Sequence, residues 1–138
     1  MPNALAILAC RQFEKLERFN AHRRKIAQLY ATGLQQSLYD LPGDLENRES
    51  IFLRYAIKHP RAHDIIRKFW RNNILIGDWY TNPVAPDDTR LDKLQYDEGS
   101  CPKAESLANV TLNLPTHIHI STREVKKIIE LLHRYASE

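Results

Sequence analysis

NALAILACRQFEKLERFNAHRRKIAQLYATGLQQS, residues 3–37, is the stretch around which the chain is organised. It contains no proline, and its single glycine, Gly33, lies near its end. Its apolar residues recur every three or four positions, as on one face of a helix: Leu5, Leu8, Phe13, Leu16, Phe19, Ile26, Leu29, Tyr30 and Leu34. The spacing predicts one helix about 50 Å long. We expect such a helix to need a partner, as in a coiled coil, a dimer seam or an interdomain spine.

Composition favours one ordinary globular domain over residues 1–138, with the long helix at 3–37 and an α/β part at 50–138. The net charge of +3 comes from scattered basic and acidic residues, which is weak evidence for a nucleic-acid partner. No apolar run approaches the ~20 residues that span a bilayer, and the N-terminus does not resemble a signal peptide. Two cysteines are too few for a disulfide scaffold, and Cys10 is expected to be buried. We therefore expect a cytoplasmic protein with no membrane or nucleic-acid partner.

The remainder of the chain alternates between short strand and helix patterns. Ile51, Leu53, Tyr55 and Ile57 alternate with other residues and predict a strand with one buried face. The remaining predicted elements are a helix over 62–70, a buried strand at 74–76, a loop over 78–100, a helix over 103–109 with Leu107 and Ala108 inward, a strand at 110–114, and a helix after the Ser121–Glu124 capping box. The predicted fold is α+β: a mainly antiparallel sheet of about three strands with helices on one face.

The residues themselves offer few candidates for chemistry. Loops longer than about 12–15 residues are often functional, and the predicted loop carries the adjacent aromatics Trp79 and Tyr80, for which core packing is the alternative. His117 and His119 would share a face of an extended segment, but no further ligand has metal-binding spacing nearby. Cys101 lacks a local base. Residues and spacing alone therefore leave an α+β domain of unknown role.

Five segments together resemble the DegT/StrS-type sugar aminotransferases. The chain's long helix, with its Arg-Arg segment and Ala-x-x-Tyr-like ending, is similar to a helix of that family. The later segments resemble the family's Gly-Ile strand with its aromatic loop, its Pro-x-Ala-Glu element and its Leu-Pro-x-His ending. The matching segments are NALAILACRQFEKL (3–16), NAHRRKIA (20–27) with AQLY (27–30), NILIGDWY (73–80), CPKAE (101–105) and NLPTH (113–117). The resemblance covers essentially the whole chain and implies the small, C-terminal domain of such an enzyme.

The resemblance implies a PLP-dependent transfer of an amino group, usually from glutamate, to a nucleotide-linked keto sugar, as in sugar and polysaccharide biosynthesis. The Schiff-base lysine and the partner of the pyridine nitrogen belong to the family's large domain, and no lysine here matches that motif. We therefore expect no PLP binding and no activity from this chain alone. The resemblance places Trp79, Tyr80 and His117 on the substrate side. Trp79 departs from the family's His-Tyr pair, so it would stack and not donate a hydrogen bond through an imidazole.

Met1 resembles an interior methionine of the family, so we expect a piece of a longer enzyme, a truncated product or one half of a split enzyme. The expected partner is the missing large domain or a separate subunit carrying it. Without it, the apolar positions near Leu5 and Leu8 lose their cover, so we expect residues 3–11 to be frayed, swapped between copies or buried in a homodimer. The alternative function is a non-catalytic domain that associates through its long helix.

Overall fold

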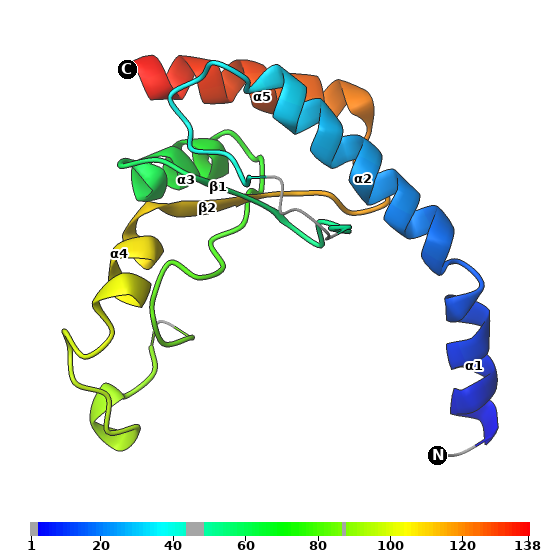
Figure 1. The fold of residues 1–138 in the computed structure, drawn as a ribbon, viewed down its shortest axis with the longest axis horizontal. Helices are drawn as coiled ribbons and strands as arrows, with labels where there is room; N and C mark the ends of the chain where they lie inside the picture. The colour runs from blue at the N-terminus through cyan, green and yellow to red at the C-terminus, as the bar shows by residue number, and fades with distance from the viewer. Residues whose placement is uncertain (1–2, 44–48, 87) are drawn as a thin grey trace.

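The computed structural model describes residues 3–43, 49–86 and 88–138. Met1, the position resembling an interior methionine of the family, lies outside them. The predicted α+β class is confirmed, with five α-helices and a two-stranded antiparallel sheet in the described part (Figure 1). The elements are α1 (Asn3–Phe13), α2 (Leu16–Gly33), β1 (Tyr55–Lys58), α3 (Ala62–Arg71), the 3-10 turn η1 (Leu91–Lys93), α4 (Pro102–Val110), β2 (Thr111–Leu114) and α5 (Thr122–Ser137).

The predicted single long helix is wrong, because the chain turns between α1 and α2. The Lys15 amide bonds the Gln12 carbonyl at 3.0 Å, a tighter i to i−3 contact, and α2 then starts at Leu16. No residue of α1 is buried, and Figure 1 shows α1 directed away from the remainder of the chain. Because nothing described packs against α1, nothing holds the two axes in line.

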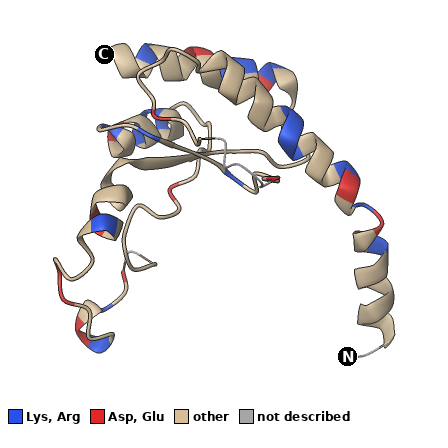
Figure 2. Cartoon of the chain, in the orientation of Figure 1, with Lys and Arg blue, Asp and Glu red and all other residues tan. Residues whose placement is uncertain are grey.

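Two expectations about α1 change for the same reason. Cys10 is exposed, not buried, because its helix face meets no described element. Residues 3–11 are helical, so the expectation of a frayed segment is wrong, whereas the exposure of Leu5 and Leu8 is confirmed at 53% and 54%. Figure 2 shows α1 almost free of charged residues, in contrast to α2, α3 and α5, where basic and acidic residues are mixed. The single chain therefore presents a lone, solvated, largely apolar helix.

The sheet is smaller than predicted. β1 and β2 pair with Tyr55 opposite Leu114 and Lys58 opposite Thr111. The predicted strand at 74–76 does not form: the Ile74 amide bonds the Phe69 carbonyl, Leu75 is 81% exposed, and only Gly77 makes an isolated bridge to Asn113. The third strand is thus reduced to one bridging residue.

The first predicted strand is also shorter than its pattern suggested. Ile51 and Leu53 are exposed, and the strand begins only at Tyr55. Phe52 has a φ of +48°, a left-handed conformation that interrupts an extended strand. Alternation was therefore a reliable guide only for Tyr55 and Ile57, which are buried.

The core lies between α2, α3, α5 and one face of the sheet. Side chains at zero exposure include Tyr30, Ile57, Phe69, Leu112 and Leu132. Figure 1 shows α2 and α5 side by side above the strands, and helix α5 also contacts α3.

Polar contacts fix both ends of α5. The predicted capping box at its start is confirmed, with the Glu124 amide donating to Ser121 Oγ and the Ser121 amide to the Glu124 carboxylate. At its end Arg61 donates to the carbonyls of Tyr135 and Ala136 at 3.0 and 2.8 Å.

The short helix predicted before β2 is confirmed, but the side of it that is buried differs from the prediction. Ala108 is buried as predicted, whereas Leu107 is exposed. None of the helices in the described ranges combines the length and apolar character needed to cross a bilayer.

Candidate functional site

The segment after Gly77 is anchored to the middle of β2. Gly77 and Asn113 exchange two backbone hydrogen bonds of 2.7 and 3.1 Å, and the Asn113 side-chain amide donates to the Trp79 carbonyl at 2.7 Å. A Cβ at Gly77 would lie only 3.1 Å from that of Asn113, so glycine permits this close approach. The start of the predicted loop is therefore held firmly on the sheet.

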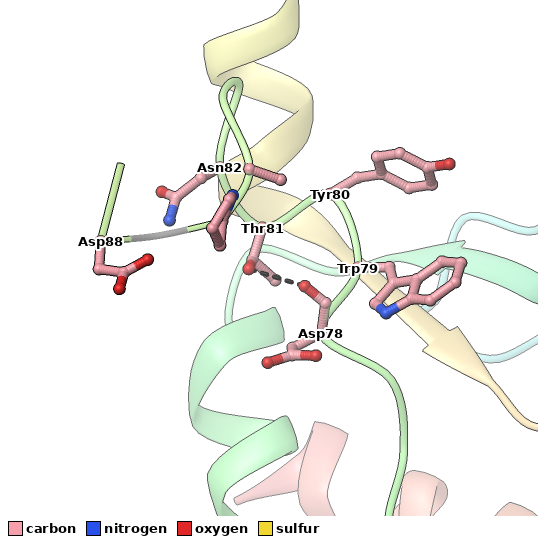
Figure 3. Close-up of a pocket in the computed structure, with 8 residues that line it drawn as sticks. Asp78, Trp79, Tyr80, Thr81, Asn82 and Asp88 are labelled. Carbon is pink, nitrogen blue, oxygen red and sulfur yellow. Dashed lines mark hydrogen bonds between the residues drawn. The ribbon is translucent and has the colours of Figure 1, made fainter. Parts of the chain in front are cut away.

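The aromatic pair extends from this anchor into solvent. Trp79 and Tyr80 are 53% and 70% exposed, and their rings meet edge to face with centroids 6.5 Å apart. Tyr80 adopts a φ of +66°, a left-handed conformation that is unusual for a bulky residue. Figure 3 shows both rings directed to one side of the loop, away from Asn82 and Asp88. Core packing, the alternative for these aromatics, is excluded for both.

Both aromatic residues line a hollow of about 660 Å³. The Thr81 hydroxyl donates to the Asp78 carbonyl at 2.8 Å, which closes the turn at its base (Figure 3). The lining residues combine two carboxylates, two large aromatics and small polar groups: Asp78, Trp79, Tyr80, Thr81, Asn82, Ala85, Pro86 and Asp88. Such a lining suits a polar ligand that also offers a flat or apolar surface, such as a sugar or a base.

Arg54 is a member of this region that the sequence did not reveal. Its guanidinium carbon lies 5.0 Å from the centroid of the Trp79 ring, a cation–π contact. The residue directly precedes β1 and is exposed. In the sequence, Arg54 stands out only as an arginine between the apolar residues Leu53 and Tyr55. Its contact with Trp79, 25 positions later, could not be predicted from that pattern.

His117 lines a different hollow, of about 400 Å³, together with Asn73, Glu124 and Lys127 among others. The structure therefore brings Trp79 and Tyr80 together but does not place His117 in their hollow. Burial, with further contributions from His119 and Arg54, lowers the pKa of His117 below its ordinary value. In the described ranges no group of three or more potential ligands could hold a metal ion, so the pair His117 and His119 gains no third partner.

The residues of the aromatic hollow do not fit PLP by themselves. None of the lining residues is a lysine that could form a Schiff base or an arginine that could hold the phosphate. Elsewhere in the described part of the chain, two lysines form ion pairs: Lys58 with Asp40 and Lys68 with Glu138. The chemistry of this hollow is therefore binding and orientation.

A small α+β unit, with five helices and a two-stranded sheet in its described residues, is the class of structure seen in one part of a sugar aminotransferase of known structure. The chain belongs to the DegT/DnrJ/EryC1/StrS aminotransferase family, whose model matches residues 1–133. The predicted family is thereby confirmed.

Similar proteins agree with this assignment. The chain is 30% identical over 125 residues to the dTDP-3-amino-3,4,6-trideoxy-alpha-D-glucose transaminase of Micromonospora megalomicea subsp. nigra, covering 87% of this chain and 33% of that protein. It is 27% identical over 128 residues to a pleiotropic regulatory protein of Geobacillus stearothermophilus, covering 91% of this chain and 34% of that protein. The fold is shared with a sugar aminotransferase of Streptococcus pneumoniae in its PMP form, at a TM-score of 0.87 and 24% identity, over 99% of this chain and 36% of that one.

The chain thus spans about a third of the length of the relatives it matches. This share is consistent with the C-terminal small domain that the sequence motifs predicted.

Proposed function

We propose that the chain is the C-terminal domain of a PLP-dependent nucleotide-sugar aminotransferase and acts on the substrate side of its active site. The observation that carries the proposal is the family match along residues 1–133, combined with an exposed aromatic pair held on the sheet. The substrate class would be a keto sugar linked to a nucleotide, dTDP in the case suggested by the name of the Micromonospora relative.

In this role the aromatic loop binds and orients the substrate. The Trp79 ring offers a flat face for a sugar or base, and the Tyr80 hydroxyl offers a hydrogen bond to a sugar oxygen. The Asn113 contact to the Trp79 carbonyl fixes where the loop leaves the sheet. His117, which lines a different hollow, is the third proposed contact to the substrate.

The proposal assigns catalysis to residues outside this chain. Since the hollow contains no lysine, the Schiff-base lysine would come from a large domain, in the same longer polypeptide or in a separate subunit. The chain alone would then have no transaminase activity. Its two exposed free thiols, Cys10 and Cys101, suit a reducing compartment, and we propose a cytoplasmic location.

Helix α1 supports a second candidate role, a helix-mediated interaction domain. Four of its large apolar side chains are more than half exposed: Leu5, Ile7, Leu8 and Phe13. Apolar faces of this kind are normally covered by a partner. In the leading proposal the cover is the large domain or a second copy, which gives the chain its role in supporting a dimer.

The test begins with the DNA upstream of the Met1 codon. The proposal expects a lysine-bearing PLP domain there, in frame or as a separate gene. The polypeptide containing that domain together with this chain should form an amino sugar from a dTDP-linked keto sugar, glutamate and PLP, whereas this chain alone should form none. Amino-sugar formation by the 138-residue chain alone would overturn the proposal.

A further inference from the structure

The open end of the β1–β2 ladder brings three distant parts of the chain together. Tyr55 opposite Leu114 is the last pair, so Arg54 leaves the sheet beside the segment that follows β2. The Thr116 hydroxyl lies 2.7 and 2.9 Å from the carbonyls of Phe52 and Leu53, which ties that segment to the backbone preceding Arg54. The Arg54 side chain therefore starts from a fixed backbone position.

The guanidinium of Arg54 is oriented but not neutralised. It lies over the Trp79 ring at 5.0 Å, a contact that leaves its N–H groups free to bind an acceptor. Arg24 and Arg90, by contrast, are paired with carboxylates, those of Glu17 and Asp92. Among the described residues, Arg54 makes no ion pair.

Two carboxylates, those of Asp78 and Asp88, line the hollow that contains Trp79, but neither makes an ion pair with Arg54 in the described part of the chain. Arg54 contributes to the electrostatic environment of His117. His119 and His22 contribute in the same direction, and the ring centroid of His119 lies 6.3 Å from that of His117. Among the described residues, the carboxylate that acts on His117 is that of Glu124. That carboxylate already accepts hydrogen bonds of 2.7 Å from both the amide and the hydroxyl of Ser121. A cationic group with free donors thus lies beside an exposed aromatic ring.

We infer that Arg54, positioned by Trp79, binds a phosphate group of the nucleotide portion of the substrate. A guanidinium presents its donors as a planar fork that matches phosphate oxygens, and it is always charged. Trp79 limits the orientations of the side chain, so less entropy is lost on binding. The nucleotide part of this inference rests on the proposed function; the anion-binding role of Arg54 rests on the geometry alone.

The experiment titrates the 138-residue chain with dTDP, with thymidine and with inorganic pyrophosphate, following the indole fluorescence and the side-chain NMR signal of Arg54. We expect dTDP and pyrophosphate, but not thymidine, to shift the Arg54 signal, with binding that weakens as salt is added. Arg54→Gln should weaken dTDP binding at least about tenfold, because a charged hydrogen bond is lost. Arg54→Lys, which keeps the charge but not the fork, should recover only part of the affinity.

Arg18→Gln is the matched control, because Arg18 also lies over an aromatic ring, that of Phe19, at 5.3 Å. It should bind dTDP as the unaltered chain does. Three results would overturn the inference: no dTDP or pyrophosphate binding at millimolar concentration, unchanged binding in Arg54→Gln, or equal losses in Arg54→Gln and Arg18→Gln. None of them touches the assignment of catalysis to a large domain, which amination by the longer polypeptide tests separately.

Discussion

At the residue scale, the imidazole of His59 is held in one protonation state by its hydrogen bond. His59 is 6% exposed, and its Nδ1 accepts a hydrogen bond from the Arg61 amide at 3.0 Å. A protonated Nδ1 could not accept that bond. Burial, with a further contribution from Arg61, lowers the pKa of His59 below its ordinary value.

This arrangement links stability to pH. Below about pH 6.5 the unfolded chain takes up a proton at His59 while the folded chain does not. We therefore expect the free energy of unfolding to be highest above that pH and to decrease as the pH falls through it, until the lowered pKa of the folded state is reached. His117, whose pKa is also lowered, acts in the same direction.

Urea unfolding at pH 7.5 and at pH 5.5 measures the effect. His59→Gln should lower stability at pH 7.5 but show a smaller loss on acidification than the unaltered chain. Gln35→Ala, at an exposed position with no titratable side chain, is the control and should leave the pH dependence nearly as it was. A pH dependence that survives in full in His59→Gln would show that His59 is not its source.

At the element scale, helices with local signals and the strand that ends at Leu114 were predictable, whereas the start of the first strand and the third strand were not. Helix α5 has its capping box and apolar stripe within one short segment, and its start was correctly predicted. The strand expected from Ile51 begins only at Tyr55. The left-handed turn at Phe52 and the hydrogen bonds from Thr116, made 63 and 64 positions away, fix the preceding segment outside the sheet.

In the candidate site too, residues close together in the sequence could be predicted, and a residue placed by distant contacts could not. Trp79 and Tyr80 could be predicted as candidates because both lie in one loop, and the structure shows both exposed with their rings in contact. Arg54 was missed because its position depends on strand register and on a ring contact across the chain. The break between α1 and α2 was missed because periodicity reports a helix face and not whether anything covers it.

The capping box makes α5 testable as an element. Ser121→Ala removes the hydroxyl that accepts from the Glu124 amide and should lower the free energy of unfolding by about 1 kcal/mol. Thermal or urea unfolding measures the change. Ser106→Ala, at an exposed position within α4, is the control and should change stability by less than about 0.5 kcal/mol. Equal effects of the two substitutions would contradict the role of the cap.

Helix α1 provides a second test at this scale. The double variant Leu8→Glu, Phe13→Glu should leave the free energy of unfolding within about 0.5 kcal/mol, because both side chains are exposed in the single chain. If α1 is a contact surface, the same variant should reduce self-association, measured by light scattering over a range of concentrations.

Leu75→Glu is the control, since Leu75 is 81% exposed but lies far from α1 in sequence. It should leave self-association unchanged. A chain that is strictly monomeric before any substitution would exclude pairing through α1 between copies and leave the large domain as the expected cover.

At the scale of the whole molecule, the chain is about one third as long as its relatives and shares the fold of one part of them. The chemistry that needs a Schiff-base lysine is not supplied by its aromatic hollow. The chain matches its family over residues 1–133, yet spans about a third of each relative. The residues of its aromatic hollow suit a polar ligand that also offers a flat surface, and none of them is a lysine. An uncovered apolar helix at one end is the feature expected where a large domain would pack.

The central claim is that this chain recognises substrate but depends on another domain for PLP. Titration of the purified chain with PLP, followed by absorbance near ~400 nm and by borohydride reduction with mass spectrometry, tests it most directly. The account predicts no stoichiometric band and only scattered, weak labelling of surface lysines. A stable one-to-one band traced to a single lysine of this chain would contradict it.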